Sequence, residues 1–311
     1  MMTVKDFLKH FGMNSFEEAA DRIKEILLKT KSITVHNGAF HEDDVKATAL
    51  ALIYAERVLT INAGEIKINR SRSNLVGLIM DVGEGFLDHH NREIFAEYED
   101  GIRYAAAGLL YEYIGRELMP SDEEFLRLKR LVFIPGDAAD NGDFSMLGTM
   151  PTFASTLNSA SNPASRNDYF MKAVEMYKSY LEASIDIAWT KHKDKEYVKE
   201  CADKAIAAGK KYIFFDRACE ADFSFLSGLG IKFVATPNDE PDTDDKFEAM
   251  SLRCEEREFF PEIINGNHVW GLRKEELSNA SGISGMEFIH KDGFFATTKT
   301  RSAMQALLDL V

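Results

Sequence analysis

Residues 33–50 read ITVHNGAFHEDDVKATAL and combine an apolar run with an unusual density of polar donors. The apolar run ends in His36, a short loop carries His41, and three acidic residues follow at positions 42–44. A surface loop has no need of two imidazoles beside three carboxylates, whereas a divalent metal ion requires such donors. We therefore predict a buried strand that delivers metal ligands to the start of a helix.

Strands and helices are predicted to alternate around this stretch. Short apolar runs predict strands at residues 32–36, 57–63 and 75–83. Helical spacing predicts helices at 43–56, 102–115 and 122–134, although the apolar end of the third is compatible with either type. Two short helices are predicted within residues 3–30, the second starting at a Ser15–Glu18 capping box. This alternation indicates an α/β fold with a doubly wound, mainly parallel sheet.

The rest of the chain predicts a connector and a second domain. Residues 148–168 are rich in Ser, Thr, Asn and Pro and predict a loop, which a long helical region follows at about 169–208. Strand-like runs resume at 211–216, 230–237, 246–253 and 286–300, and a helix is predicted at 301–311. We expect an N-terminal helical segment (1–30), a larger α/β domain (31–165), a helical connector (166–208) and a smaller α/β domain (209–311).

Composition is that of an ordinary globular protein and excludes several classes. The 311 residues are 45% hydrophobic and 28% charged, without the roughly 18 uninterrupted apolar residues that a membrane helix needs. The N-terminus lacks the apolar core of a signal peptide, so we expect a cytoplasmic protein. Three widely spaced cysteines support neither a disulfide framework nor a thiolate zinc site. The net charge of −14 opposes loose binding to long nucleic acid, but permits a phosphate substrate where metal ions reverse the local charge.

Further metal donors follow other predicted elements, and ligands collect at the carboxyl ends of strands in open α/β sheets. The additional donors are Asp81 after one apolar run, Asp88, His89 and His90 in FLDHHN (86–91), and Asp137 and Asp140 after another run. Each feature alone is compatible with a turn, a helix cap or surface residues. Together, imidazoles and carboxylates are the ligand set of Mn, Fe or Zn, and two divalent ions would offset acids that otherwise repel one another.

Four motifs, in this order, resemble a known family. HNGAFHEDD (36–44), MDVGEG (80–85), DHHN (88–91) and DAADNG (137–142) are similar to motifs of the melanocyte proliferating gene family, within the DHH phosphoesterase superfamily. The stretch 270–301 is also similar to the end of that family, and the resemblance extends over about residues 32–308. The chain departs from the family pattern at four places: HCDE is HEDD (41–44), RTRD is RSRS (70–73), GGH is ATT (296–298), and the segment between Asp81 and Asp88 is shorter than expected.

The resemblance implies a DHH catalytic domain at 31–165, a substrate-binding domain at 209–311, and a hydrolase with two divalent metal ions, typically Mn²⁺. By position it implies the metal ligands His36, His41, Asp43, Asp81, His89 and Asp140, with Asp81 shared between the ions; Asp137 is the alternative to Asp140. Asp88 and His90 would then be the catalytic pair, with His90 acting at the leaving oxygen and Asp88 orienting a histidine.

Characterised relatives in this family act as exonucleases on RNA, so the resemblance implies a 3′–5′ exonuclease-like phosphodiesterase for single-stranded RNA or short oligonucleotides. A homodimer is compatible with the sequence. In each of the pairs Arg70–Arg72 and Lys299–Arg301, alternate spacing would place both cations on one face of a strand, where they could bind phosphate or form a solvated edge. The alternatives are a metal-dependent hydrolase of peptide, amide or pyrophosphate bonds, and a non-catalytic protein that binds metal or nucleotide.

Overall fold

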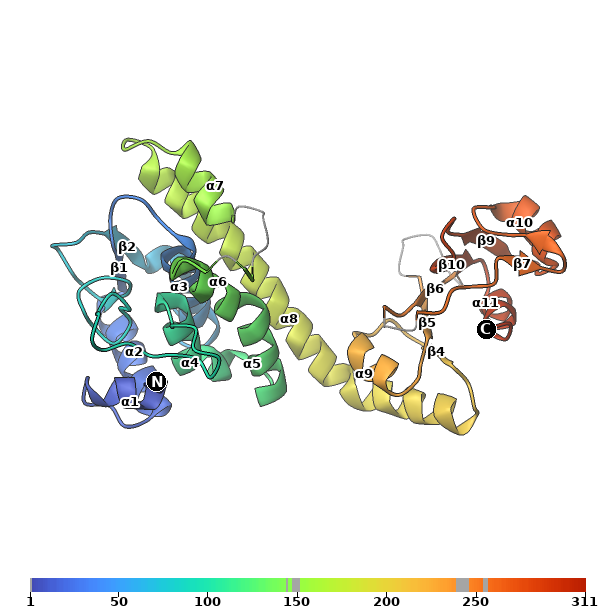
Figure 1. The fold of residues 1–311 in the computed structure, drawn as a ribbon, viewed down its shortest axis with the longest axis horizontal. Coiled ribbons are helices and arrows are strands. Elements are labelled where there is room, and N and C mark those ends of the chain that lie inside the picture. Colours follow the sequence, from blue (N-terminus) through green and yellow to red (C-terminus); the bar gives the residue numbers. More distant parts are fainter. Residues whose placement is uncertain (1, 144, 147–151, 239–245, 254–256) are drawn as a thin grey trace. The chain divides into compact units, whose positions relative to one another are not determined.

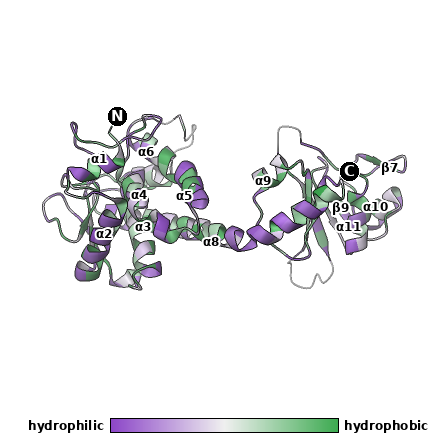
Figure 2. Ribbon diagram, turned by 90° about the horizontal axis from the view of Figure 1, so that it is seen from below, coloured by the Kyte–Doolittle hydropathy of each residue, from purple (hydrophilic) through white to green (hydrophobic). Residues whose placement is uncertain are grey.

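The computed structural model divides the chain into two compact units, Met1–Trp189 and Thr190–Val311 (Figure 1). It describes all residues except 1, 144, 147–151, 239–245 and 254–256. The division falls inside the long helix α8 (Arg166–Ala207), along which hydrophilic and hydrophobic segments alternate (Figure 2). Within the described ranges, no helix is both long and apolar enough to cross a membrane.

The sheet of the first unit contains β1 (Ser32–Val35), β2 (Lys67–Arg70) and β3 (Leu78–Ile79). The strand order is β2-β1-β3, and both pairs are parallel. Every residue of β1 is buried, as expected of a central strand. Because β1 and β3 run in the same direction, the residues that follow them emerge at the same edge of the sheet. The predicted α/β class is confirmed, with a parallel sheet in this unit.

Helices account for most of the first unit. They are α1 (Val4–Lys9), α2 (Phe16–Thr30), α3 (Glu42–Arg57), α4 (Ala106–Leu118), α5 (Asp122–Leu128), α6 (Ile134–Asp140), α7 (Phe153–Ala160) and the first part of α8. Helix α3 contacts β1, and α2 contacts β3. The predicted start of α2 is confirmed: the Ser15 side chain accepts from the Glu18 amide, and the Glu18 carboxylate accepts from the amide of Asn14.

Two of the predicted strands differ from the observed ones. Residues 57–63 do not form a strand, since α3 extends to Arg57 and a 3₁₀ turn (Ala63–Glu65) precedes β2. Val58, Leu59 and Ile61 are apolar because they pack against the core at the end of α3. The strand predicted at 75–83 is reduced to Leu78–Ile79, since the backbone is left-handed at Gly77 (φ +75°) and Asp81 (φ +56°) on either side.

The helix predicted at residues 122–134 is confirmed, including its apolar end, since a short π-helical turn (Lys129–Phe133) joins α5 to α6. Residues 148–168 are not a continuous loop, because α7 occupies Phe153–Ala160; residues 148–151 lie outside the described part. The hydroxyl of Thr152 caps α7 by accepting from the Ser155 amide, and buried Ala154 packs on the core.

The second unit contains a mixed five-stranded sheet in the order β4-β5-β6-β10-β9. Its strands are β4 (Tyr212–Phe214), β5 (Phe233–Pro237), β6 (Phe247–Ser251), β9 (Met286–Ile289) and β10 (Phe295–Thr298). Only β4 and β5 pair in parallel; the other pairs are antiparallel. Helices α9 (Phe223–Gly228), α10 (Lys274–Ser281) and α11 (Arg301–Leu308), and a small hairpin of β7 (Ile263–Ile264) and β8 (Asn267–His268), complete the unit.

We predict that Gly77→Ala destabilises the first unit far more than Gly12→Ala does. Both glycines are left-handed (φ +75° and +74°), but a Cβ at Gly77 would lie 2.0 Å from the carbonyl oxygen of Ser32 in β1, whereas Gly12 faces open space. The overlap should bring the loss in free energy of unfolding to about 3 kcal/mol at Gly77, against about 1–2 kcal/mol for the left-handed backbone alone. Urea denaturation followed by circular dichroism measures both, and equal losses would contradict the packing of β3 against β1.

Candidate metal centre

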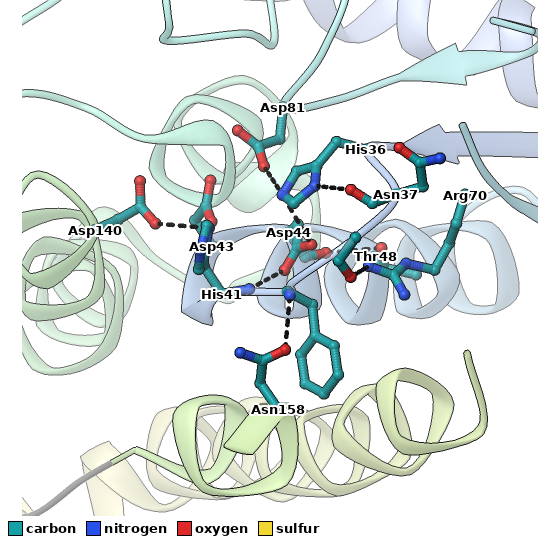
Figure 3. A network of polar contacts seen from close by, with 12 residues as sticks. His36, Asn37, His41, Asp43, Asp44, Thr48, Arg70, Asp81, Asp140 and Asn158 are labelled. Carbon is teal, nitrogen blue, oxygen red and sulfur yellow. Dashed lines mark hydrogen bonds and ion pairs between the residues drawn. The ribbon is translucent and has the colours of Figure 1, made fainter. Parts of the chain in front are cut away.

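Polar side chains from four segments of the first unit point toward one another at the carboxyl edge of the sheet (Figure 3). His36 directly follows β1, and Asp81 closely follows β3. Asp43 and Asp44 lie in the first turn of α3. Asp140 is the last residue of α6, from a different part of the sequence. The strand order and the helix ends therefore bring these donors together.

His36 faces two carboxylates with a single ring nitrogen. Its Nδ1 lies 3.0 Å from the carbonyl oxygen of Asn37, and a carbonyl can only accept, so Nδ1 carries the hydrogen. Its Nε2 lies 3.1 Å from Oδ2 of Asp81 and 3.4 Å from Oδ2 of Asp44. The lone pair of an unprotonated Nε2 would repel both carboxylates. Only a proton on Nε2, or a metal cation at this position, removes this repulsion.

His89 forms a second group around the opposite oxygen of Asp81. Its Nε2 lies 3.1 Å from Oδ1 of Asp81, 3.2 Å from Oδ2 of Asp140 and 3.5 Å from Oδ2 of Asp43. The carboxylate of Asp81 therefore contacts His36 with one oxygen and His89 with the other. The two oxygens of Asp81 thus connect two histidines that come from different segments.

His41 and His90 occupy the more exposed side of the cluster. Nδ1 of His41 lies 3.9 Å from Oδ1 of Asp140, and the side chain is 56% exposed. Nδ1 of His90 lies 2.7 Å from Oδ1 of Asp88, and its side chain is 59% exposed. Asp88 is held in turn by the Glu84 amide, which donates to its Oδ2. Asp88 therefore orients the His90 ring, and the ring remains accessible from solvent.

In the part of the chain that the structure describes, three groups of donors are close enough to share a metal ion. They are His36–Asp44–Asp81, Asp81–His89–His90 and His41–Asp43–Asp140. Among the described residues, the buried side-chain oxygens without a hydrogen-bond partner include both oxygens of Asp43 and Oδ2 of Asp44. Burying unpaired carboxylate oxygens is costly unless a cation binds them. The donor set and these oxygens fit divalent metal ions.

The ionisation of the cluster reflects the same crowding. Burial, and then the charge of Asp81, raises the pKa of Asp43 well above its usual range and that of Asp44 to about 8. Burial would also raise the pKa of Asp81, but hydrogen bonds from His36 and His89 hold it below its usual value. Burial would lower the pKa of His36, but Asp81 and Asp44 raise it to about 8. The raised pKa values mean that His36, Asp43 and Asp44 hold protons more readily than usual. Bound cations could take the place of these protons.

The structure brings together all six residues expected as metal ligands and adds a seventh, Asp44. Asp44 is completely buried and also accepts the amide hydrogen of His41 at 3.0 Å. Its position next to Asp43 in the HEDD run was the available signal. Asp140, not Asp137, lies in the cluster, because both oxygens of Asp137 accept hydrogen bonds elsewhere, from Tyr98 and Gly108.

The basic residues expected at the substrate do not have the predicted strand arrangement. Strand β2 ends at Arg70 and β10 ends at Thr298, while Arg301 begins α11, so neither pair alternates along a strand. The guanidinium of Arg70 donates to Gly38 and Asn167 and stacks on the ring of Phe170.

The other three basic residues are exposed, and two of them form ion pairs. Arg72 lies on the surface of the first unit. In the second unit, Lys299 pairs with Glu287, and Arg301 pairs with Asp216.

Comparisons with known proteins agree with the four motifs. The model of the MYG1_exonuc family, described as uncharacterised protein family UPF0160, matches residues 32–310. A MYG1 protein of Chlamydia pneumoniae is 28% identical, with coverage of 90% of this chain and 96% of the relative. MYG1 proteins of Schizosaccharomyces pombe and Saccharomyces cerevisiae are each 24% identical, with 86% and 92% of this chain and 93% and 97% of the relatives covered. No solved structure matches. The chain belongs to the MYG1, or melanocyte proliferating gene, family.

Proposed function

We propose that this protein is a two-metal-dependent phosphoesterase of the DHH type that hydrolyses phosphodiester bonds. The observation that carries the proposal is Asp81, whose two oxygens face His36 and His89 within a buried cluster that also holds unpaired carboxylate oxygens of Asp43 and Asp44. The exonuclease element in the name of the matching family supports a nucleic acid substrate. We propose 3′–5′ exonuclease-like action on single-stranded RNA or short oligonucleotides, because the net charge of −14 disfavours long polyanions.

The cations, for which we propose Mn²⁺, would be held by the residues of the cluster. Asp81 would be shared between two ions, and the other ligands would be His36, His41, Asp43, Asp44, His89 and Asp140. Imidazole nitrogen together with carboxylate oxygen suits Mn²⁺, Fe²⁺ or Zn²⁺. When bound, such ions lower the pKa of water and neutralise charge on phosphate oxygens.

The chain's own groups for proton handling are His90 and Asp88. The carboxylate of Asp88 lies 2.7 Å from Nδ1 of His90 and stabilises the protonated ring, so the pKa of His90 is raised. This leaves Nε2 of His90 to donate a hydrogen to a phosphate or leaving oxygen. The role that we propose for His90 is therefore to protonate the departing oxygen, and for Asp88 to orient the ring.

The basic residues have separate proposed roles. Arg70 is engaged by Gly38 and Asn167, so it supports the loop between His36 and His41 rather than a substrate. Arg72, Lys299 and Arg301 remain candidates for phosphate binding, since an exposed cation can exchange a protein carboxylate for a substrate phosphate. Arg72 belongs to the first unit, with the proposed metal ligands, and Lys299 and Arg301 belong to the second unit.

A substrate panel tests the proposal. The protein is stripped of metal, reloaded with Mn²⁺ and incubated with single-stranded RNA, short oligonucleotides, cyclic dinucleotides, pyrophosphate and a peptide mixture. Release of nucleotides that depends on Mn²⁺ would support a phosphodiesterase. Release of phosphate from pyrophosphate alone, or of peptides, would replace it with another hydrolase, and inactivity on every substrate would favour a protein that binds metal without turnover.

We predict that Asp81→Asn and His89→Ala abolish Mn²⁺-dependent hydrolysis, by at least about a hundredfold, with little change in far-UV circular dichroism. Asp81 contacts His36 and His89, and His89 contacts Asp81, Asp140 and Asp43, so each change removes several contacts of the cluster. His268→Ala is the matched control, because His268 is an exposed histidine of the second unit that pairs with Glu262. Near-full activity in either cluster variant would show that the ligand assignment is wrong.

We predict that Mn²⁺ stabilises the protein more at pH 8 than at pH 6. The pKa values of His36 and Asp44 are raised to about 8 in the folded protein, so the folded state holds more protons than the unfolded chain over this range. Stability without metal should therefore fall as pH rises toward 8. Metal ions replace these protons and reverse the loss. Thermal unfolding of chelator-treated and Mn²⁺-loaded protein at pH 6, 7 and 8 measures the difference, and a gain that is independent of pH would contradict it.

A further inference from the structure

Asp137 is a fully buried acid that lies one turn before Asp140 in α6 and has no place in the proposed chemistry. Its Oδ2 accepts from the hydroxyl of Tyr98 at 2.8 Å, and its Oδ1 accepts from the amide of Gly108 at 3.2 Å. Both oxygens are therefore occupied by hydrogen-bond donors of the protein. They are not available to a metal ion.

The contact with Gly108 makes Asp137 a cap for another helix. Helix α4 begins at Ala106, and its N-cap residue Ala105 has no side chain that can accept a hydrogen bond. The carboxylate of Asp137 takes this role from α6, since it accepts an amide hydrogen of the first turn of α4. An anion at a helix N-terminus is favoured both by the free amides and by the helix dipole.

The residues around Asp137 fix its contact with α4 closely. A Cβ at Gly108 would lie 1.8 Å from Oδ2 of Asp137 and 2.4 Å from the hydroxyl oxygen of Tyr98, so the close approach requires glycine. The side-chain amide of Asn141 donates to the carbonyl oxygens of Asp137 and Arg103, which ties the end of α6 to the segment before α4 a second time. The C-terminal turn of α6 is thus fixed on both sides of Asp140.

We propose that Asp137 is a positioning residue: by capping α4 it fixes the last turn of α6 and so directs the carboxylate of Asp140 toward His89 and Asp43. The inference rests on the proposed metal centre, in which Asp140 is a ligand. Among the described residues, the Asp140 carboxylate pairs with two metal-ligand candidates, His89 (Oδ2, 3.2 Å) and His41 (Oδ1, 3.9 Å), so its placement depends on the backbone that carries it. Supporting contacts of this kind commonly change metal affinity by 10- to 100-fold when removed.

The test compares two buried tyrosines whose hydroxyls donate to different acceptors. Tyr98→Phe removes the donor to Asp137 and keeps the ring, which stacks on Tyr104. Tyr111→Phe removes a similar buried donor, whose acceptor is the carbonyl oxygen of Phe125, away from Asp140. Mn²⁺ affinity and stoichiometry are measured by calorimetry and by the electron paramagnetic resonance of the bound ion, alongside the urea midpoint of each variant. Asp137→Asn, which keeps the shape of the side chain and removes its charge, is the second variant.

We expect both tyrosine variants to lose similar stability, and only Tyr98→Phe to weaken Mn²⁺ binding, by about tenfold. Asp137→Asn should weaken it at least as much and change the resonance spectrum of the bound ion. Equal Mn²⁺ affinities for Tyr98→Phe, Tyr111→Phe and the unmodified protein would overturn the proposal, as would absence of Mn²⁺ binding by the unmodified protein. Mn²⁺ binding without hydrolysis of any phosphodiester would instead refute the proposed function and leave the positioning role intact.

Discussion

Mutual repulsion between buried carboxylates is the constraint on which the first unit depends. Asp43, Asp44 and Asp81 are 1%, 0% and 2% exposed, and they lie around the same histidines. Like charges at this spacing are strongly unfavourable in a poorly solvated place. The protein offsets part of the repulsion with imidazoles and with the N-terminus of α3, whose free amides favour negative charge. The rest of the repulsion must be offset by bound protons or by bound cations. The fold therefore requires positive charge at this site, which a metal ion can supply.

Secondary structure is predicted best where the local sequence pattern and the packing of the segment in the fold favour the same element. The strand predicted at residues 32–36 and the helix predicted at 43–56 correspond to β1 and α3, because the buried run of β1 and the long apolar stretch of α3 are both continuous. Residues 57–63 have the composition of a strand but do not form one. They start at the end of α3, and their apolar side chains pack on the core from irregular backbone. Residues 153–160 form α7 in spite of their Ser and Thr content, because tertiary packing of Ala154 outweighs a weak local preference.

The site was predictable as a set of residue types, but not as a set of contacts. The motifs identified the six expected ligands, whereas the distinction between Asp137 and Asp140 depends on Tyr98 and Gly108, which come from other segments. The spacing of Arg70 and Arg72 suggested a shared strand face, but the end of β2 is set by the turn that follows it. Contacts between distant segments decide these roles, and a single sequence carries no direct signal of them.

The short segment between Asp81 and Asp88 shows how the backbone assembles the centre. Asp81 (φ +56°), Gly83 (φ +85°) and Glu84 (φ +57°) are all left-handed, so the chain reverses immediately after β3. The amide of Asp81 donates to the carbonyl oxygen of Leu87, which closes the loop and returns His89 to within 3.1 Å of Asp81. A left-handed aspartate costs about 1 kcal/mol, and aspartate tolerates this conformation better than most residues. The left-handed residue thus stands where one carboxylate lies between two histidines, His36 and His89, that are distant in the sequence.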